Sequence, residues 1–377
     1  MSKNKVFGII TLIVLVVGAG FLLSRDNSTT PANKEPIVLG ALYPLTGGLA
    51  SFGEASQKSA LLAMEEINQG GGVVGRPLQI DFQDHQCNPK TALTIYTQLH
   101  DVKNIRVFTS AACTGTVLTL APLLKDSTLL TATLSGDKVT GVSPNVFRNW
   151  ASDGLEAKLF AEEIKKNGYK SVAVIYEQTD YAKGLKDVLE KQLLGTDIKI
   201  VSEGFASDAA DVRTQLTKLS AEKSELWFLS PQTAITGDKI LKEMQELNIK
   251  PQVLFVNDAL SKSTDLVTNY KTFLEGAITG DFVFAKSEKI DTFLKKYQER
   301  YGVECKVKNI CATAYDNIYM LKAAIEKNGY SGEAVMNYLK TVKFDGVSGM
   351  VSFDEKNDRS GAAYSLFTIK DGKTVLK

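Results

Sequence analysis

The sequence contains few of the residues on which metal sites and acid–base catalysis depend, and it has no excess of either charge. Only two histidines and four cysteines occur among 377 residues, which leaves little room for zinc sites or histidine-based catalysis. Lysine and arginine number 44 against 43 aspartate and glutamate, so the net charge of +1 argues against a nucleic-acid-binding protein. Nine prolines and 29 glycines are ordinary numbers, which excludes a collagen-like or wholly disordered chain. The length exceeds one ordinary domain and fits two, each able to bury its own core.

One long apolar run lies near the N-terminus, from Val6 to Leu23, and follows Lys3 and Lys5. As a helix, this run is roughly 27 Å long, which is just enough to cross the hydrocarbon core of a bilayer. Residues 1–23 are therefore interpreted either as a cleaved signal peptide or as an uncleaved signal anchor. Cleavage after residues 17–19 would leave an apolar new terminus, which favours the anchor. In both cases the lysines keep the short N-terminal side cytoplasmic, so we expect the rest of the chain to be exported.

The next segment, residues 24–36, has the polar composition of a linker. Export affects the interpretation of the cysteines, because four cysteines outside the cytoplasm can pair. Their order in the chain predicts two disulfides, Cys87–Cys113 and Cys305–Cys311. On the chain-entropy model the longer loop stabilises the fold by roughly 3 kcal/mol and the shorter by about 2 kcal/mol. Two weaker alternatives are half of a metal site at His85 and Cys87, and a thiol nucleophile at Cys113.

From Ile37 onward, short apolar runs alternate with amphipathic segments. The apolar runs predict strands at 37–42, 78–82, 106–108, 129–132, 171–176, 199–201, 226–229 and 253–256. The amphipathic segments predict helices at 54–68, 91–100, 118–126, 155–167, 181–194, 211–221, 239–247 and 288–300. Gly168 is placed to end one of these helices. This alternation predicts an α/β protein with parallel sheets covered by helices on both faces, and the length fits two such sheets better than one.

Polar and aromatic residues follow several of the predicted strands. In α/β sheets, ligands bind outside the carboxyl ends of the strands. That rule selects Pro44-Leu45-Thr46, Ala112-Cys113-Thr114, Ser135-Gly136-Asp137, Tyr181, Gln232 and Asn257-Asp258. Hydroxyls, carboxylates and aromatic rings in this set indicate ligand binding more than catalysis.

A glycine-rich motif at residues 70–75 matches G-x-G-x-x-G, the pattern of dinucleotide-binding loops. In such loops the motif follows a strand and opens a helix, so that the helix terminus faces the pyrophosphate. Here it follows a predicted helix and precedes a predicted strand, so we interpret it as a helix stop and turn. No G-x-S-x-G nucleophile elbow occurs in the sequence. We therefore expect a protein that is not an enzyme and uses no cofactor.

Several segments resemble, in order, the type I periplasmic binding proteins, and most closely the leucine/isoleucine/valine-binding proteins that serve ABC transporters. The matching segments are Ile37–Gly40, Pro44–Gly47 with Phe52-Gly53, Ala63–Leu78, Asp84–Lys90 with Cys113, and Phe344–Asp354. The resemblance implies two doubly wound lobes joined by hinge crossings, which close on a ligand like a flytrap. It places lobe 1 at residues 37–151 and 281–367, and lobe 2 at 152–280 and 368–377. It also supports the Cys87–Cys113 disulfide, whereas Cys305 and Cys311 are not part of the common pattern.

The resemblance implies a site for the two charged ends of an amino acid. Ala112 and Thr114 match the positions that hold the ligand carboxylate through a backbone amide and a hydroxyl. Ser135 and Asp137 match the next contact loop, although a carboxylate at position 137 departs from the family pattern. Asp258 matches an acidic residue that pairs with the ligand ammonium. A zwitterion needs such donors and acceptors in any case, because each buried unpaired charge costs several kcal/mol.

The remaining site residues implied by the resemblance form the walls of the pocket. Tyr181 matches a tyrosine that faces the ligand from lobe 2, and Tyr315 matches a further pocket tyrosine. Phe52 matches an aromatic residue that lines the side-chain pocket, and Gln232 replaces an aromatic residue of lobe 2. Asp137 and Gln232 together favour a ligand that is more polar or cationic than leucine. Each residue also has a structural alternative, such as a strand-end cap for Thr114, a turn for Asp258 or a core position for Tyr315.

The resemblance thus predicts a monomeric, exported protein that captures an amino acid or similar small zwitterion and delivers it to an ABC permease. The alternative is a sensory module of the same fold that passes lobe closure to a membrane signalling protein.

Overall fold

The computed structural model of the chain describes residues 35–111, 113–131, 135–283 and 287–377. Residues 36–377 form one compact unit. The predicted signal segment at 1–23 lies outside the described residues, as do most of the linker and Ala112. Among the helices of the described segments, none has the length and apolar character needed to span a membrane.

The first lobe is built on a five-stranded sheet with the order β2-β1-β3-β4-β5, and every pair in it is parallel. Its strands are β1 (Ile37–Tyr43), β2 (Leu78–Asp84), β3 (Val107–Ser110), β4 (Thr128–Thr131) and β5 (Val146–Arg148). The α-helices around it are α2 (Ala50–Gln69), α3 (Pro89–Thr97), α4 (Thr114–Leu120), α11 (Glu288–Tyr301), α12 (Lys308–Asn328) and α13 (Gly332–Leu339). Smaller elements are η1 (Gln98–Val102), η2 (Ala121–Leu123), η3 (Asp137–Val139) and the hairpin of β11 (Phe344–Gly346) and β12 (Gly349–Val351).

The second lobe contains a seven-stranded sheet with the order β14-β13-β10-β9-β8-β6-β7. Its strands are β6 (Ser171–Glu177), β7 (Lys199–Phe205), β8 (Leu226–Ser230), β9 (Val253–Val256), β10 (Ile278–Val283), β13 (Ala363–Lys370) and β14 (Lys373–Leu376). Its helices are α5 (Gly154–Asn167), α6 (Asp180–Leu193), α7 (Arg213–Ala221), α8 (Ala234–Glu246), α9 (Asp258–Ser261) and α10 (Thr264–Asn269). The five strands from β6 to β10 are parallel, whereas β13 and β14 are antiparallel additions at one edge.

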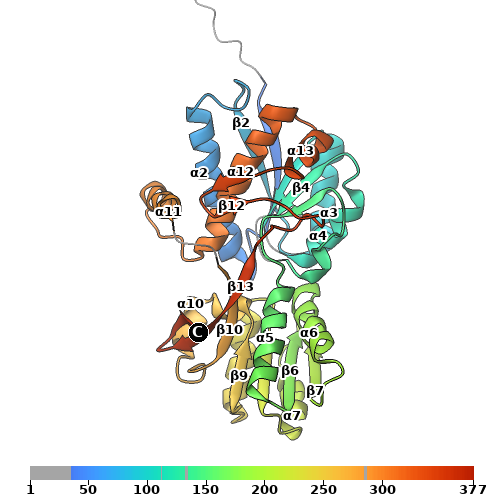
Figure 1. Cartoon of the computed structure of the whole chain (residues 1–377), viewed down its shortest axis with the longest axis vertical. Coiled ribbons are helices and arrows are strands. Elements are labelled where there is room, and N and C mark those ends of the chain that lie inside the picture. The colour runs from blue at the N-terminus through green and yellow to red at the C-terminus, as the bar shows by residue number, and fades with distance from the viewer. Residues whose placement is uncertain (1–34, 112, 132–134, 284–286) are drawn as a thin grey trace, which may run out of the picture. The chain divides into compact units, whose positions relative to one another are not determined.

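The order of the elements takes the chain from one sheet to the other after β5, after β10 and before β13. Figure 1 shows β13 running beside β10 as it enters the second lobe, and the register pairs Ile278 with Thr368. The lobe boundaries implied by the resemblance, 280/281 and 367/368, fall inside β10 and β13, both of which the structure assigns to the second sheet. The predicted fold, two lobes with doubly wound parallel sheets, is confirmed.

Each sheet separates two apolar cores, and alternate side chains of a strand enter opposite cores. On β1, Leu39 and Ala41 belong to the core beneath α2 and α12, whereas Leu42 belongs to the core beneath α3 and α4. On β6, Ala173 and Val174 are divided between two cores in the same way. Strands buried on both faces appear as continuous apolar runs in the sequence, which is why they were predictable.

The predicted helix stop at Gly168 is confirmed, since this residue caps α5 in the left-handed conformation with φ +74°. The glycine-rich motif is also a turn between α2 and β2, as expected. A Cβ atom on Gly72 would lie 2.0 Å from the carbonyl oxygen of Arg76, and its φ is +79°, so only glycine fits there. The predicted helix at 118–126 is wrong in its bounds, because α4 begins earlier and ends at Leu120. Pro122 has no amide hydrogen to continue the helix, and the chain changes to a short 3-10 turn.

Candidate ligand-binding cleft

A cavity of about 420 Å³ lies where the carboxyl ends of strands from both sheets meet. The residues that line it follow β1, β2 and β3 in the first lobe and β6, β7 and β8 in the second. They include Pro44, Thr46, Gln86, Cys113 and Thr114 from the first lobe, and Gln178, Asp180, Ser207 and Gln232 from the second. This is the location that the strand-end rule predicts.

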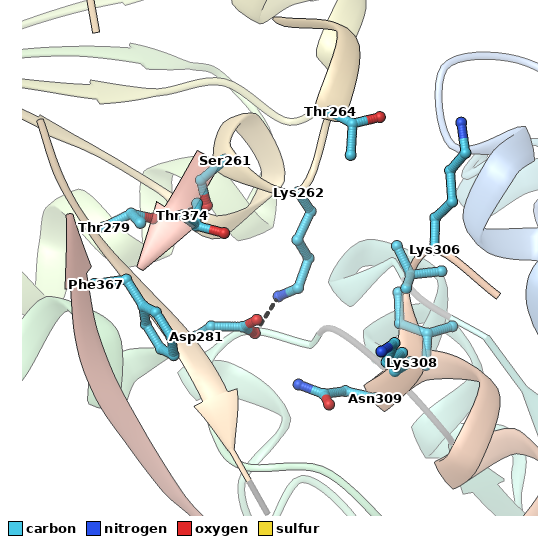
Figure 2. Close-up of a pocket in the computed structure, with 12 residues that line it drawn as sticks. Ser261, Lys262, Thr264, Thr279, Asp281, Lys306, Lys308, Asn309, Phe367 and Thr374 are labelled. Carbon is cyan, nitrogen blue, oxygen red and sulfur yellow. Dashed lines mark hydrogen bonds and ion pairs between the residues drawn. The ribbon is translucent and has the colours of Figure 1, made fainter. Parts of the chain in front are cut away.

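Two further cavities lie along the same boundary between the lobes. One, of about 380 Å³, shares Gly48 and Leu49 with the first cavity and extends past Phe52 to Lys262. Another, of about 250 Å³, shares Lys262 and Lys306 with the second and is shown in Figure 2. The cleft therefore has a polar part at the strand ends and an extension that reaches Lys262.

Thr114 lines the polar part and is bonded to Gly136. The Thr114 side chain begins α4, is 1% exposed, and its Oγ1 accepts a hydrogen bond from the backbone N–H of Gly136 at 2.8 Å. Ser135 is fully buried, and within the described part of the chain its Oγ has no hydrogen-bond partner. A buried hydroxyl without a partner is uncommon in folded proteins.

The backbone of the Ser135 loop is held from behind by a buried arginine. Arg148 Nη1 donates to the carbonyl oxygens of Ser135 at 2.7 Å and Gly136 at 3.0 Å. Asp137, the next residue, is exposed and accepts a hydrogen bond from the hydroxyl of Ser152 at 3.1 Å. A Cβ atom at Gly154 would lie 2.6 Å from Asp137 Oδ1, so the chain that enters the second lobe passes close to this carboxylate.

Asp258 and Tyr181 meet inside the second lobe. Asp258 follows β9, is fully buried, and accepts a short hydrogen bond from the Tyr181 hydroxyl. It also accepts from the ammonium of Lys262 at 2.5 Å, one helical turn further along the chain. Lys262 pairs in addition with Asp281 on β10 at 2.7 Å, as Figure 2 shows. Burial would lower the pKa of Lys262, but the two carboxylates overcome this and hold it above its usual range.

Two more carboxyl groups are buried close to Asp258. Asp153 accepts a hydrogen bond from the Tyr364 hydroxyl at 2.7 Å, and Glu156 accepts from the backbone N–H of Gly280 at 3.0 Å. Burial, and next the charge of Asp258, raise the pKa of Asp153 to about 7 and the pKa of Glu156 well above its usual value. The junction of the lobes therefore concentrates acidic groups around a single buried ammonium.

Phe52 and Gln232 both lie on the cleft, on opposite lobes. Phe52, on α2, is 6% exposed, lines the 380 Å³ cavity and belongs to an apolar cluster with Trp150 and Phe282. Gln232 lies half-buried on the 420 Å³ cavity, and its backbone N–H donates to the carboxylate of Glu177 at 2.7 Å. Of the predicted site residues in the described segments, Phe52, Thr114 and Gln232 line these cavities, whereas Ser135, Asp137, Tyr181 and Asp258 do not.

Tyr315 is not brought to the cleft, and its assignment to the pocket is corrected by the structure. It lies on α12, packs between Phe293 and Tyr319, and donates a hydrogen bond to Glu66 on α2. Its ring is 7% exposed and lines a separate surface depression with Lys296. The helical position turns this side chain toward the helices that cover the first sheet, away from the strand ends.

Both predicted disulfides are present. Cys87 and Cys113, with Cα atoms 5.5 Å apart, join the loops after β2 and β3 and line the 420 Å³ cavity. Both cysteines have positive φ, +55° and +77°, a conformation that non-glycine residues rarely adopt. The bond between Cys305 and Cys311, with Cα atoms 6.6 Å apart, closes the loop that carries Lys306. The first disulfide thus fixes two unusual loop conformations directly at the cleft.

The alternative metal site at His85 finds no support in the geometry. His85 is fully buried, and its Nδ1 accepts a hydrogen bond from the backbone N–H of Cys87 at 2.9 Å. Burial lowers the pKa of this imidazole to about 4, so it is neutral near pH 7. Within the described segments, no three His, Cys, Asp or Glu side chains are grouped to hold a metal ion.

Sequence reasoning missed Lys262, Arg148 and Trp150, which surround the predicted ligand residues. Lys262 had one available signal, its position four residues after Asp258, which places the two side chains on the same side of a helix. Arg148 ends β5 and Trp150 follows it. Neither carried a local signal, because their partners Asp358 and Tyr364 lie more than 200 residues further along the chain.

The fold and the interlobe cleft define a solute-binding protein of the two-lobed class. The chain belongs to the periplasmic binding protein family, whose model matches residues 36–374, and it is of type I. Similar proteins include Leu/Ile/Val-binding protein homolog 3 of Brucella melitensis, 27% identical over 90% of this chain and 93% of that protein. The Leu/Ile/Val-binding protein of Escherichia coli is 22% identical over 88% of this chain and 90% of its own length.

Solved structures share the fold at lower sequence identity. The leucine-binding protein LivK of Thermotoga maritima has a TM-score of 0.80 at 20% identity, covering 90% of this chain and 97% of that chain. The substrate-binding protein LivJ of Streptococcus pneumoniae, solved with isoleucine, has a TM-score of 0.75 at 22% identity, covering 91% and 100%. A solute-binding protein of R. palustris, solved with benzoate, has a TM-score of 0.77 at 16% identity, covering 90% and 95%.

Proposed function

We propose that this protein captures an amino acid or a similar small carboxylate between its two lobes and delivers it to an ABC importer. The observation that carries the proposal is the position of Thr114 on the wall of the 420 Å³ cavity. Its side chain is bonded to the loop of Ser135, whose buried hydroxyl has no partner among the described residues. Hydroxyls and backbone N–H groups at the carboxyl ends of parallel strands are suited to bind a carboxylate. The role is binding and transport rather than catalysis, without a cofactor.

Closure on the ligand follows from the position of the cavity. Its lining comes from both lobes, so a bound molecule contacts Thr114 on one side and Gln232 on the other. A ligand that makes contacts only in the closed arrangement shifts the population toward it. Lys138 and Asp180 add a contact across the boundary, with Nζ and Oδ1 3.3 Å apart. This pair is half-exposed, so we expect it to contribute little to the free energy of closure.

The ligands of similar proteins support the proposal that the ligand is an amino acid or a similar small carboxylate. Relatives include Leu/Ile/Val-binding proteins, and proteins of the same fold have been solved with isoleucine, with leucine and with benzoate. All of these ligands carry a carboxylate next to an apolar group. The 380 Å³ extension of the cleft, with Leu49, Phe52 and Ala55, offers an apolar surface for such a group.

Export, membrane attachment and oligomeric state are part of the same proposal. The protein acts as a monomer outside the cytoplasmic membrane, where two disulfides are stable, and residues 6–23 serve as its signal or anchor. Its partner is the permease that accepts the ligand on lobe opening.

A thermal-shift screen of the full-length protein against the amino acids and small carboxylic acids tests the proposal, because a ligand that binds only the native state raises the Tm. Calorimetry with the best ligand then compares Thr114→Val with Thr119→Val on the same helix, whose hydroxyl donates to Gly115 at 2.9 Å. We expect Thr114→Val to weaken binding by about tenfold and Thr119→Val to leave it unchanged. A screen without any stabilising compound, or equal affinities for both variants, would contradict the proposal.

A further inference from the structure

The ammonium of Lys262 lies in a cage, which here means the two carboxylates and the one aromatic ring that surround it. Its Nζ lies 2.5 Å from the carboxylate of Asp258 and 2.7 Å from that of Asp281, and its side chain is 9% exposed. It also lies 5.5 Å from the centre of the Trp150 ring. Two carboxylates and an indole face are the groups by which proteins bind ammonium ligands. In this protein the chain itself supplies the cation.

The two carboxylates that contact Lys262 are already paired, whereas Asp153 Oδ2 and Glu156 Oε2 have no hydrogen-bond partner among the described residues. Asp258 accepts from Tyr181 as well as from Lys262, and Asp281 pairs with the same lysine. Asp153 accepts a hydrogen bond from Tyr364. Burial raises the pKa of Glu156 well above its usual value, which favours its neutral form over the charged form.

An amino acid that placed its ammonium at Asp258 would have to compete with Lys262 for this carboxylate. Displacing Lys262 from two carboxylates would leave a buried ammonium without its partners, which costs several kcal/mol. Placing both ammonium groups side by side would add repulsion between like charges in a poorly solvated site. A ligand without an amino group avoids both penalties. Its carboxylate can use the hydroxyl of Thr114, which lines the 420 Å³ cavity.

We propose that Lys262 is a built-in counter-ion of Asp258 and that the cleft, in consequence, selects small carboxylic acids without an amino group over the matching α-amino acids. This inference rests on the proposed function, since it specifies the ligand class of the same cleft. It makes Lys262 a specificity-determining residue, because its charge replaces the ligand ammonium at Asp258.

Three pairs of ligands test the inference by isothermal titration calorimetry on the full-length protein. The pairs differ only in the amino group: leucine and 4-methylpentanoate, isoleucine and 3-methylpentanoate, phenylalanine and 3-phenylpropanoate. We expect the wild-type protein to bind the better acid of the set at least about tenfold more tightly than its amino-acid partner. We expect Lys262→Ala to reverse this preference, because Asp258 then has no cation until the ligand brings one.

A second variant keeps the test decisive if Lys262→Ala does not fold. Lys262→Met combined with Asp258→Asn removes both charges, and we expect it to keep the wild-type preference for the acid. Lys308→Ala is the matched control, since Lys308 lines the same cavity in Figure 2 but is exposed. We expect Lys308→Ala to leave the ratio of affinities unchanged.

The possible results separate the two proposals. Tighter binding of an amino acid than of its partner acid by the wild-type protein would overturn the role of Lys262 and leave the proposed function intact. A double variant that prefers the amino acid, or a Lys308→Ala variant that reverses the preference, would also overturn it. Binding of none of the six compounds would overturn the inference, whereas the proposed function is contradicted only if the thermal-shift screen also finds no stabilising compound.

Discussion

The buried guanidinium of Arg148 forms a two-pronged ion pair with the carboxylate of Asp358, which lies 210 residues further along the chain. Nε is 2.9 Å from Oδ1 and Nη2 is 2.5 Å from Oδ2, and the Arg148 side chain is 1% exposed. The remaining nitrogen, Nη1, donates to the carbonyl oxygens of Ser135 and Gly136. Asp358 thus orients the arginine, and the arginine positions the Ser135 loop.

Substitution of this pair should affect stability and binding together. We expect Asp358→Asn to lower the free energy of unfolding by about 3 kcal/mol, because a buried arginine loses its counter-ion. Ligand affinity should fall as well, since the Ser135 loop loses its support. Urea denaturation and calorimetry measure the two effects. As a control, Lys199→Ala breaks the exposed pair with Glu222 and should cost less than about 1 kcal/mol. Equal losses in the two variants would contradict the structural role of Arg148.

Two tyrosines predicted for the same pocket should respond differently to loss of the hydroxyl. Tyr315→Phe removes a hydrogen bond to Glu66 far from the cleft, so we expect a loss of about 1 kcal/mol in stability and unchanged ligand affinity. Tyr181→Phe removes a hydrogen bond to Asp258 at the cleft, and we expect weaker binding. Calorimetry with the best ligand of the thermal-shift screen compares the two. Weaker ligand binding by Tyr315→Phe would contradict the position of Tyr315 outside the pocket.

Ser135→Ala should separate binding from stability. Its Oγ has no partner in the described part of the chain, so its removal should change the free energy of unfolding by less than about 0.5 kcal/mol. If the hydroxyl contacts the ligand, affinity should fall about fivefold. Ser56 is a matched control, because its buried Oγ also lacks a partner among described residues and it lies on α2, away from the loop that binds Thr114. Unchanged affinity in Ser135→Ala would exclude this ligand contact.

The buried carboxyl of Asp153 should make stability depend on pH. Burial and the charge of Asp258 raise its pKa to about 7 in the folded state, against about 4 in an unfolded chain. Between about pH 4 and 7 the folded state therefore holds a proton that the unfolded state has lost. The free energy of unfolding should fall as the pH rises through this window.

Asp153→Asn tests that dependence, because the amide oxygen can still accept the hydrogen bond from Tyr364. We expect a smaller fall in stability between pH 5 and 7 than in the wild-type protein, measured as urea midpoints at several pH values. Asp197→Asn, at a side chain that is 74% exposed, should leave the wild-type dependence in place. A parallel pH dependence in Asp153→Asn and wild type would show that Asp153 does not titrate in this range.

The two disulfides should contribute unequally to the free energy of unfolding. Replacing both Cys87 and Cys113 by alanine should lower the free energy of unfolding by roughly 3 kcal/mol, whereas replacing Cys305 and Cys311 should lower it by about 2 kcal/mol, because the second loop is shorter. Only the first pair lies at the 420 Å³ cavity, so only its loss should weaken binding through the strand-end loops. Urea denaturation and calorimetry compare the variants with wild type. A larger loss from the Cys305–Cys311 pair would contradict the chain-entropy account.

Much of the fold was accessible from local patterns. Apolar runs such as that of β6 predict strands because parallel strands are buried on both faces, and Gly168 predicts a helix end because of its freedom at positive φ. The strand-end rule found the cleft, including Thr114 and Gln232. Tyr315 was misplaced because similarity of sequence around it does not specify which way its side chain points from α12.

The sequence by itself determined the alternation of strands and helices, the two lobes, both disulfides and the strand ends at which a ligand would bind. These follow from periodicity, turn residues and the order of the cysteines, all of which act over short distances in the chain. Only the tertiary structure decided that Lys262 pairs with Asp258 and that Tyr315 donates a hydrogen bond to Glu66. It also decided that Arg148, held by Asp358, binds the carbonyl oxygen of Ser135. Charges and hydroxyls choose partners by distance and burial in the folded state, and residues such as Arg148 and Asp358 become neighbours only after the lobes have formed.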